Sequence, residues 1–427
     1  MQRLKNLKSS LKLYAVTDRY WLNGRLLKDD VEKAILGGAT MIQLREKELD
    51  KESFIKEALE IKEICKKYDV PFIINDSLDV FLAVDADGLH VGQDDLRADI
   101  AREKIGPNKI LGVSCETVEE AVLAEKMGAD YLGVGTIFNT STKLDAKSVS
   151  IKTLTSICDS TKIPVVAIGG ITKENICELR DTMIDGISVV SAIFKENDIV
   201  KATKELVKRV DEILLNTNNY KLFIVDYDGT LLESMSMWDD ITSRYLKSKG
   251  IIPPKSIDYD VRLQTNDETA EYLKNLFFKD SNVKGVMDDL NKFIMNEYVK
   301  IELNEGAKDF LIDLNKKGLV VLYTATTSKL IEASLEKNGI KDLFKHLYTS
   351  STYNVTKVNG LGYIDIAKNL GFNTNETLIV EDAPHALVGA HMSGIKVLGV
   401  KSSSNFRHFD DIVRLNCDYY INLRRYQ

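Results

Sequence analysis

The sequence predicts two consecutive α/β domains: a (β/α)8 barrel of the TIM type, then a second α/β domain with a helical insertion. Short β-branched runs alternate with charged segments of helical period from Leu11 to about Leu215. After a polar segment without periodicity, the same alternation starts again at Leu222. Strand–helix alternation is typical of parallel sheets. We therefore assign residues 1–215 to the first domain and residues 216–427 to the second.

The first half contains eight strand candidates, which is the number that a closed barrel of this size requires. They begin at Leu13, Met41, Pro71, Gly88, Ile110, Tyr131, Pro164 and Gly186. Helices are predicted between them at Asp29–Leu36, Lys51–Lys67 and Val118–Met127. An open doubly wound sheet is the alternative, but it rarely has eight strands without a glycine-rich turn after the first.

The second half opens with a buried strand, Leu222–Val225, followed by a mostly helical stretch at about 232–304. Further strand candidates begin at Leu319, His346, Thr377 and Ile395. This order predicts an α/β domain that carries a helical insertion after its first strand.

Composition limits the class of protein. The chain of 427 residues is 28% charged with a net charge of -7, which excludes the basic surface of a nucleic-acid binder. No run of apolar residues is long enough for a membrane span or a signal peptide, so we expect a cytoplasmic protein that does not bind membranes. The five cysteines contain no CxxC pair, which argues against a disulfide framework or a zinc site.

Polar residues gather where the predicted barrel strands end, and active sites of such barrels lie there. They are Gln43, Arg45, Lys47, Asn75, Asp76, Asp95, Ser114, Thr140, Thr142, Lys143 and Ser191, and Gly170 and Val190 stand at the same strand ends. Carboxylates such as Asp76 and Asp95 suit Mg²⁺, and Arg and Lys side chains suit phosphate oxygens. The loops after strands seven and eight commonly hold a phosphate. The pattern predicts displacement of a metal-bound diphosphate by a second, phosphorylated substrate.

Taken singly, these residues also have structural interpretations. The segment around Arg45 is compatible with a salt-bridged surface face, Asp76 with a helix cap, and His90 with a core position. Their combined placement at successive strand ends favours a functional site.

The motifs QLREK, IIND, GLHVGQDD, GVS, TSTKLDA, VVAIGGI and VVSAI resemble, in this order, those of thiamine phosphate synthases across residues 11–214. The resemblance implies that diphosphate leaves the aminopyrimidine and that the thiazole nitrogen captures the resulting cation. It assigns the pyrimidine diphosphate, Mg²⁺ and thiazole phosphate ligands in turn: Gln43, Arg45, Lys47, Asn75, Ser114 and Lys143; Asp76 and Asp95; Thr140, Thr142, Gly170, Val190 and Ser191. Thr136 and Asn139 stand where the family commonly has prolines. A related barrel that isomerises the thiazole phosphate is the alternative.

The second domain carries two carboxylates, Asp226 and Asp228, at i and i+2 directly after a strand. They share one face, so one can attack phosphorus while the other protonates the leaving oxygen. Thr324 and Lys357 follow later strands and offer a phosphate donor and a cation. Glu381 and Asp382 offer metal carboxylates.

DYDGT, Thr324, Lys357 and IVEDAPHALVGAHMSGIKVLGV together resemble the haloacid dehalogenase superfamily over about 220–405. The resemblance implies a Rossmann-like fold with a helical cap at about 232–304. It also implies that Asp226 is the nucleophile, that Asp228 is the acid and base, and that Thr324 and Lys357 bind the phosphate. Mg²⁺ is assigned to Asp226, Asp382 and the Asp228 backbone, supported by Glu381. Val358 and Asn359 stand where the family usually has Lys-Pro.

The sequence thus predicts a multifunctional, Mg²⁺-dependent enzyme that acts on phosphorylated small molecules. Thiamine phosphate is the predicted substrate of the second domain, and a non-catalytic sensor of phosphorylated ligands is the alternative. The sequence leaves open that substrate, any channelling between the domains, and whether the chain forms a homo-oligomer.

Overall fold

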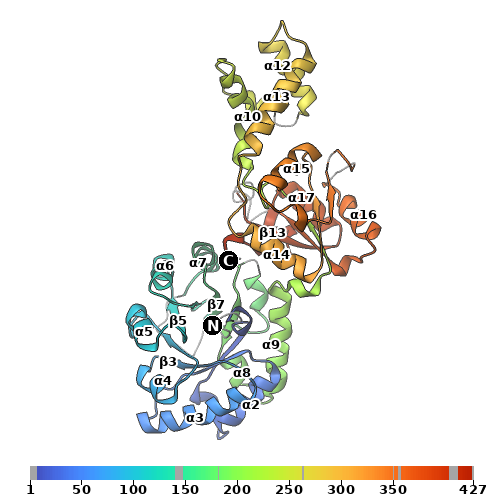
Figure 1. The fold of residues 1–427 in the computed structure, drawn as a ribbon. Coiled ribbons are helices and arrows are strands. Elements are labelled where there is room, and N and C mark those ends of the chain that lie inside the picture. The colour runs from blue at the N-terminus through green and yellow to red at the C-terminus, as the bar shows by residue number, and fades with distance from the viewer. Residues whose placement is uncertain are drawn as a thin grey trace. The chain divides into compact units, whose positions relative to one another are not determined.

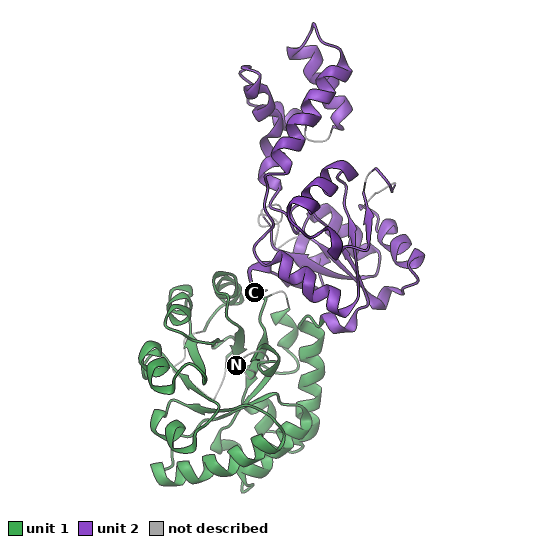
Figure 2. Cartoon of the chain, in the orientation of Figure 1, with its two compact units in different colours: residues 1–216 green, residues 217–427 purple. Residues whose placement is uncertain are grey.

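The structure is a computed structural model that describes residues 7–139, 148–180, 182–261, 264–349, 351–353, 357–402 and 412–425. The chain divides into two compact units, residues 1–216 and residues 217–427 (Figure 2). We call the first the barrel unit and the second the sheet unit. Both are α/β with parallel strands, so the predicted fold class is confirmed.

The barrel unit is a closed barrel of eight parallel strands in sequential order (Figure 1). All eight predicted strands are confirmed. They are β1 Leu13–Val16, β2 Met41–Leu44, β3 Phe72–Asn75, β4 Gly88–Val91, β5 Ile110–Cys115, β6 Tyr131–Val134, β7 Val165–Ile168 and β8 Gly186–Val189.

Helices surround the barrel, and the three that the sequence predicted are confirmed to within two residues. The helices are α1 Leu7–Ser10, α2 Leu27–Gly37, α3 Lys51–Lys67, α4 Leu78–Val84, α5 Ala98–Ile105, α6 Val118–Lys126, α7 Ile151–Ser160, α8 Ser191–Phe194 and α9 Ile199–Ile213. Two short 3-10 helices, η2 Arg19–Trp21 and η3 Ile176–Leu179, lie in the loops after β1 and β7. One face of each strand packs against the helices, and the other face points into the barrel.

A chain of buried hydrogen bonds crosses the barrel interior. The Gln43 amide donates to the hydroxyl of Tyr14 at 2.6 Å, and that hydroxyl lies 2.8 Å from the hydroxyl of Tyr131. Tyr131 contacts Nδ1 of His90, and Nε2 of His90 contacts Ser114, both at 2.9 Å. Buried polar groups are costly unless they are paired, so this network of five polar side chains removes a cost that would otherwise destabilise the interior.

The network needs a position without a side chain on β5. A Cβ atom on Gly112 would lie 2.2 Å from the Tyr131 ring and 2.4 Å from Nδ1 of His90. A Cβ on Gly133 would lie no closer than 3.1 Å from His90. The interior rings therefore depend mainly on Gly112.

We predict that Gly112→Ala lowers the free energy of unfolding of the barrel unit by about 2 kcal/mol, because overpacking forces the rings off their positions. Gly133→Ala is the matched variant and is expected to cost less. Urea denaturation of both variants, followed by circular dichroism, measures the difference. Equal stability of the two variants would contradict the packing argument.

The sheet unit contains a six-stranded parallel sheet in the order β11-β10-β9-β12-β13-β14. The strands are β9 Leu222–Val225, β10 Leu319–Tyr323, β11 His346–Tyr348, β12 Thr377–Glu381, β13 Lys396–Val400 and β14 Tyr419–Ile421. Sequence analysis missed β14, a three-residue edge strand. Because β9 lies in the middle of the sheet, the residues that follow it meet the end of β12.

Helices α14 Ala307–Lys317, α15 Ser328–Lys337, α16 Leu361–Asn369, α17 Pro384–Met392 and α18 Arg414–Asn416 accompany the sheet. The predicted insertion contains α10 Met235–Ser248, α11 Ile257–Asp260, α12 Asn266–Phe277 and α13 Val283–Tyr298, grouped together in Figure 1. Leu232 and Leu303 form an antiparallel bridge, so this cap leaves and rejoins the sheet unit at one place. Among the described helices, none combines the length and hydrophobicity that crossing a bilayer requires.

Candidate active sites

A cavity of about 370 Å³ opens at the carboxyl ends of the barrel strands. Ten of the residues that the sequence proposed for this site line it. They are Gln43, Arg45, Lys47, Asn75, Asp76, Asp95, Ser114, Gly170, Val190 and Ser191. The other three, Thr140, Thr142 and Lys143, lie outside the described residues.

The alternation of β2 explains why its polar residues gather on one side. Gln43, Arg45 and Lys47 are two residues apart and line the cavity, whereas Leu44 and Glu46 are absent from its lining. Side chains of an extended chain point alternately to opposite faces. A two-residue spacing of an amide and two cations is therefore enough to place all three on the cavity side.

Two carboxylates from neighbouring strand ends face this cavity. Lys47 pairs with Asp76 at 2.6 Å, and Asn75 donates to the other oxygen of Asp76, also at 2.6 Å. Burial raises the pKa of Asp76, and its contact with Asp95 adds to this against the opposing effect of Lys47. Asp95 also accepts the backbone N–H of Gly92 at 2.8 Å. Two carboxylates this close are stabilised by a shared cation, and hard oxygen ligands of this kind fit Mg²⁺.

The opposite side of the cavity is built from backbone. Gly169 and Gly170 follow β7 with φ of +99° and +62°, which favours glycine, and a Cβ on Gly170 would lie 2.5 Å from the carbonyl of Phe138. The short helix α8 begins at Ser191 directly after β8. Loops after strands seven and eight, together with a short extra helix, are the common phosphate site of such barrels.

Sequence reasoning missed Tyr14 and Ser188, which also line the cavity. They are paired in register across β1 and β8. The signal was available, because period-two alternation in LYAV and GISV places both side chains on the interior face.

In the sheet unit, three buried acids form a cluster, and a buried lysine pairs with two of them. Lys357 pairs with Asp226 and lies 2.8 Å from Glu381. Oxygens of Asp226, Glu381 and Asp382 lie within 4.8 Å of one another. Burial alone would lower the pKa of Lys357, but the charges of Asp226 and Glu381 outweigh it and the net pKa is raised. Lys357 is only 8% exposed, so it is not a solvated surface lysine.

The charge balance around Asp226 favours a further cation. Burial raises the pKa of Asp226 well above its ordinary value, and the negative charges of Glu381 and Asp382 add to this effect. Asp382 accepts hydroxyl hydrogen bonds from Thr230 and Ser402, both at 2.7 Å, which fix its orientation. Three converging carboxylates and one lysine leave a net negative charge, so the donor set fits a divalent cation.

Asp228 is held differently. Ser234 and Tyr298 donate to its Oδ1 at 2.7 and 2.8 Å, and Thr326 donates to its Oδ2 at 2.8 Å. Its carboxylate thus turns towards the cap helix α13 rather than towards the acidic cluster. Thr324 is buried at the end of β10, where its hydroxyl accepts the backbone N–H of Thr326 at 3.2 Å.

Comparisons with known proteins match the two halves of the chain to two different families. The family described as "Thiamine monophosphate synthase" matches residues 13–193, and "Haloacid dehalogenase-like hydrolase" matches residues 222–400. The thiamine-phosphate synthase of Clostridium tetani is 54% identical over 194 residues, which are 45% of this chain and 93% of that protein. The chain belongs to the thiamine-phosphate synthase family. Its second half is a haloacid dehalogenase-like hydrolase domain.

Two solved structures are also similar. Thiamine phosphate pyrophosphorylase from Pyrococcus furiosus is 44% identical, covers 49% of this chain and 100% of its own, and gives a TM-score of 0.46. A putative beta-phosphoglucomutase from Thermotoga maritima is 15% identical, covers 48% of this chain and 96% of its own, and gives a TM-score of 0.43. The two family matches and the Clostridium tetani relative confirm both family resemblances found in the sequence.

Residues that depart from the family patterns lie in both domains. In the synthase domain, Thr136 lines the cavity and Asn139 is exposed. In the hydrolase domain, Val358 is 60% exposed, while the preceding Lys357 keeps its two buried carboxylate partners. The unusual residues after Lys357 therefore do not remove the lysine from the acidic cluster.

We predict that His90 of the synthase domain stays neutral well below the ordinary histidine range, because burial lowers its pKa to about 4 while Asp95 opposes the shift. Its stabilising contribution is present above about pH 6.5 and is lost as the pH falls through about 4. Proton NMR titration of the five histidines, with His90→Gln to identify the signal, measures this. A His90 signal that titrates near pH 6.5 would contradict it.

Proposed function

We propose that the barrel condenses an aminopyrimidine diphosphate with a thiazole phosphate to give thiamine phosphate and free diphosphate. The observation that carries this is the meeting of Arg45, Lys47, Asp76 and Asp95 around one cavity. Two cations and two carboxylates at a strand-end mouth form a subsite for a magnesium diphosphate. The thiazole phosphate isomerase alternative has no use for that set.

The residues of the chain have distinct roles in this proposal. Gln43 holds the polar edge of the pyrimidine, with its amide oriented by the hydroxyl of Tyr14. Arg45 and Lys47 bind the diphosphate oxygens and stabilise the charge that develops as the C–O bond to the pyrimidine methylene breaks. Asp76 and Asp95 hold the Mg²⁺, which supplies further charge neutralisation to the departing diphosphate.

The thiazole phosphate, which is the second substrate, binds on the side of the cavity opposite the diphosphate. Backbone N–H groups of Gly170 and Ser191 bind the thiazole phosphate, and the thiazole nitrogen forms the new C–N bond to the methylene carbon. Thr140, Thr142 and Lys143 belong to this proposal through the family pattern alone, since they lie outside the described residues.

Asp76→Asn is expected to lower kcat/KM for thiamine phosphate formation by about a hundredfold, because it removes charge that orients the metal and Lys47. Asp79→Asn is the matched control, since Asp79 forms an exposed pair with Lys51 away from the cavity lining. Thiamine phosphate is quantified by its fluorescent oxidation product. Equal activity of the two variants would contradict the assignment of Asp76.

For the hydrolase domain we propose phosphate ester hydrolysis, with thiamine phosphate as the substrate. Asp226 attacks phosphorus, and the ester oxygen leaves with a proton from Asp228, which gives an aspartyl phosphate. Water then attacks this phosphate while Asp228 takes its proton, and Asp226 is released. Glu381 and Asp382 hold the Mg²⁺ with Asp226, which neutralises charge on the transferring phosphoryl group.

The arrangement supports turnover better than ligand sensing. Lys357 neutralises part of the charge around Asp226, and the cap residue Tyr298 reaches Asp228. Both carboxylates of the proposed reaction are thereby held in defined orientations. Thiamine phosphate is favoured as substrate because the proposed product of the barrel is itself a phosphate monoester made by the same chain.

We expect the full chain to release phosphate from thiamine phosphate, and Asp226→Asn to abolish this release because no nucleophile remains. Asp309→Asn, an exposed position on α14, is the control and is expected to retain activity. Removal of divalent metal by EDTA should have the same effect as Asp226→Asn. Phosphate release from other esters but not from thiamine phosphate would reject the substrate, and release from none would favour the sensor.

A further inference from the structure

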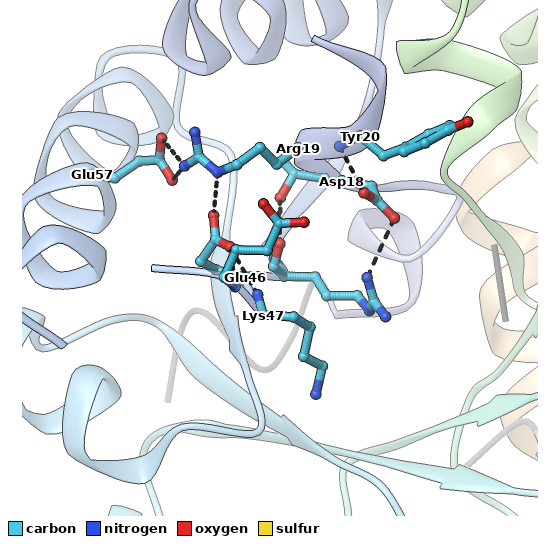
Figure 3. A network of polar contacts seen from close by, with 9 residues as sticks. Asp18, Arg19, Tyr20, Glu46, Lys47 and Glu57 are labelled. Carbon is cyan, nitrogen blue, oxygen red and sulfur yellow. Dashed lines mark hydrogen bonds and ion pairs between the residues drawn. The ribbon is translucent and has the colours of Figure 1, made fainter. Parts of the chain in front are cut away.

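Arg19 links three elements of the barrel behind the cavity, without lining it. Its Nε donates to Glu46 at 2.8 Å, and its Nη2 donates to both oxygens of Glu57 at 2.8 and 2.7 Å. Figure 3 shows its guanidinium group between the two carboxylates. Arg19 belongs to η2 and Glu57 to α3, while Glu46 lies in the loop after β2.

Glu46 connects Arg19 to the backbone of Lys47, which lines the cavity. Its side chain is 2% exposed, and its second oxygen accepts the backbone N–H groups of Lys47 and Glu48, each at 2.8 Å. The carboxylate therefore fixes the backbone that carries Lys47. On the other side, the backbone N–H of Arg45 donates to the hydroxyl of Thr17 at 3.1 Å.

Arg19 and Glu46 balance each other's charge next to the two cations of the cavity. Arg45 and Lys47 face the cavity two residues apart, where Arg45 pairs with Asp18 at 3.3 Å and Lys47 with Asp76 at 2.6 Å. Buried Glu46 lies behind them and needs a cation of its own, which Arg19 supplies. Without Arg19, Glu46 and Glu57 would be left with uncompensated charge, and the loop would move to relieve it.

We infer that Arg19 is a positioning residue for the diphosphate subsite, acting through Glu46 on Arg45 and Lys47. This inference rests on the proposed synthase function. Through Glu46, Arg19 fixes the backbone that carries the two cations before the substrate binds, so little ordering is left to the binding step.

The test replaces the guanidinium group of Arg19, which binds two carboxylates at once, by the single ammonium group of a lysine. Arg19→Lys keeps the charge but satisfies the two carboxylates less well. The matched control is Arg102→Lys, because Arg102 binds Asp130 and the carbonyls of Gly128 and Lys109, in the loops that precede β5 and β6. Both variants are expected to lower the melting temperature. Only Arg19→Lys is expected to raise KM for the pyrimidine diphosphate, by about tenfold, with KM for the thiazole phosphate unchanged.

Calorimetric titration with inorganic pyrophosphate and Mg²⁺ gives a second readout that needs no turnover. Arg19→Lys should weaken pyrophosphate binding about tenfold, and Arg102→Lys should not. If Arg19→Lys fails to fold, Glu57→Gln removes the charge of one of the two carboxylates that Arg19 binds. This variant should also weaken pyrophosphate binding.

The outcomes separate the two claims. A wild-type chain that forms no thiamine phosphate rejects the proposed function. A wild-type chain that is active, with unchanged pyrophosphate binding and KM in Arg19→Lys, rejects the positioning role alone. Equal increases in KM for both substrates would also reject it, because they indicate a general loss of structure.

Discussion

Parallel strand pairing is the constraint on which both sites depend. All strands of a parallel sheet end at the same edge, so the residues that follow several strands meet whatever their distance in sequence. In the barrel this brings together residues that follow β2, β3 and β4, including Lys47, Asp76 and Asp95. In the sheet unit it brings Asp226 after β9 next to Glu381 at the end of β12.

Burial then decides how the gathered charges are arranged. An unpaired charge inside a protein is strongly destabilising, so the buried lysine of the sheet unit is paired with its acids, and the more exposed lysine of the barrel also has an acidic partner. Lys47 pairs with Asp76, and Lys357 pairs with Asp226 and Glu381. In each site the acids still outnumber this lysine, which leaves a place for a metal ion and lets the lysine turn to a phosphate when the metal is bound.

The sequence predicted what depends on local pattern: the eight barrel strands, the helical insertion, and the strand-end residues of the cavity. It could not predict contacts that depend on three-dimensional pairing. Arg19 reaches Glu57 across 38 residues of chain, and Tyr14 reaches Tyr131 across 117. The space for the ring of His90 depends on Gly112, which its motif alone does not identify as a packing position. Strand β14 was missed because three residues give no periodicity.

A crystal structure of the full chain grown with Mg²⁺ and inorganic pyrophosphate tests the central claim most directly. The account predicts pyrophosphate at the barrel mouth against Arg45 and Lys47, with Mg²⁺ on Asp76 and Asp95 and the direct bond between Lys47 and Asp76 broken. Pyrophosphate bound away from this cavity, or a Lys47–Asp76 pair left intact with the ligand present, would contradict it.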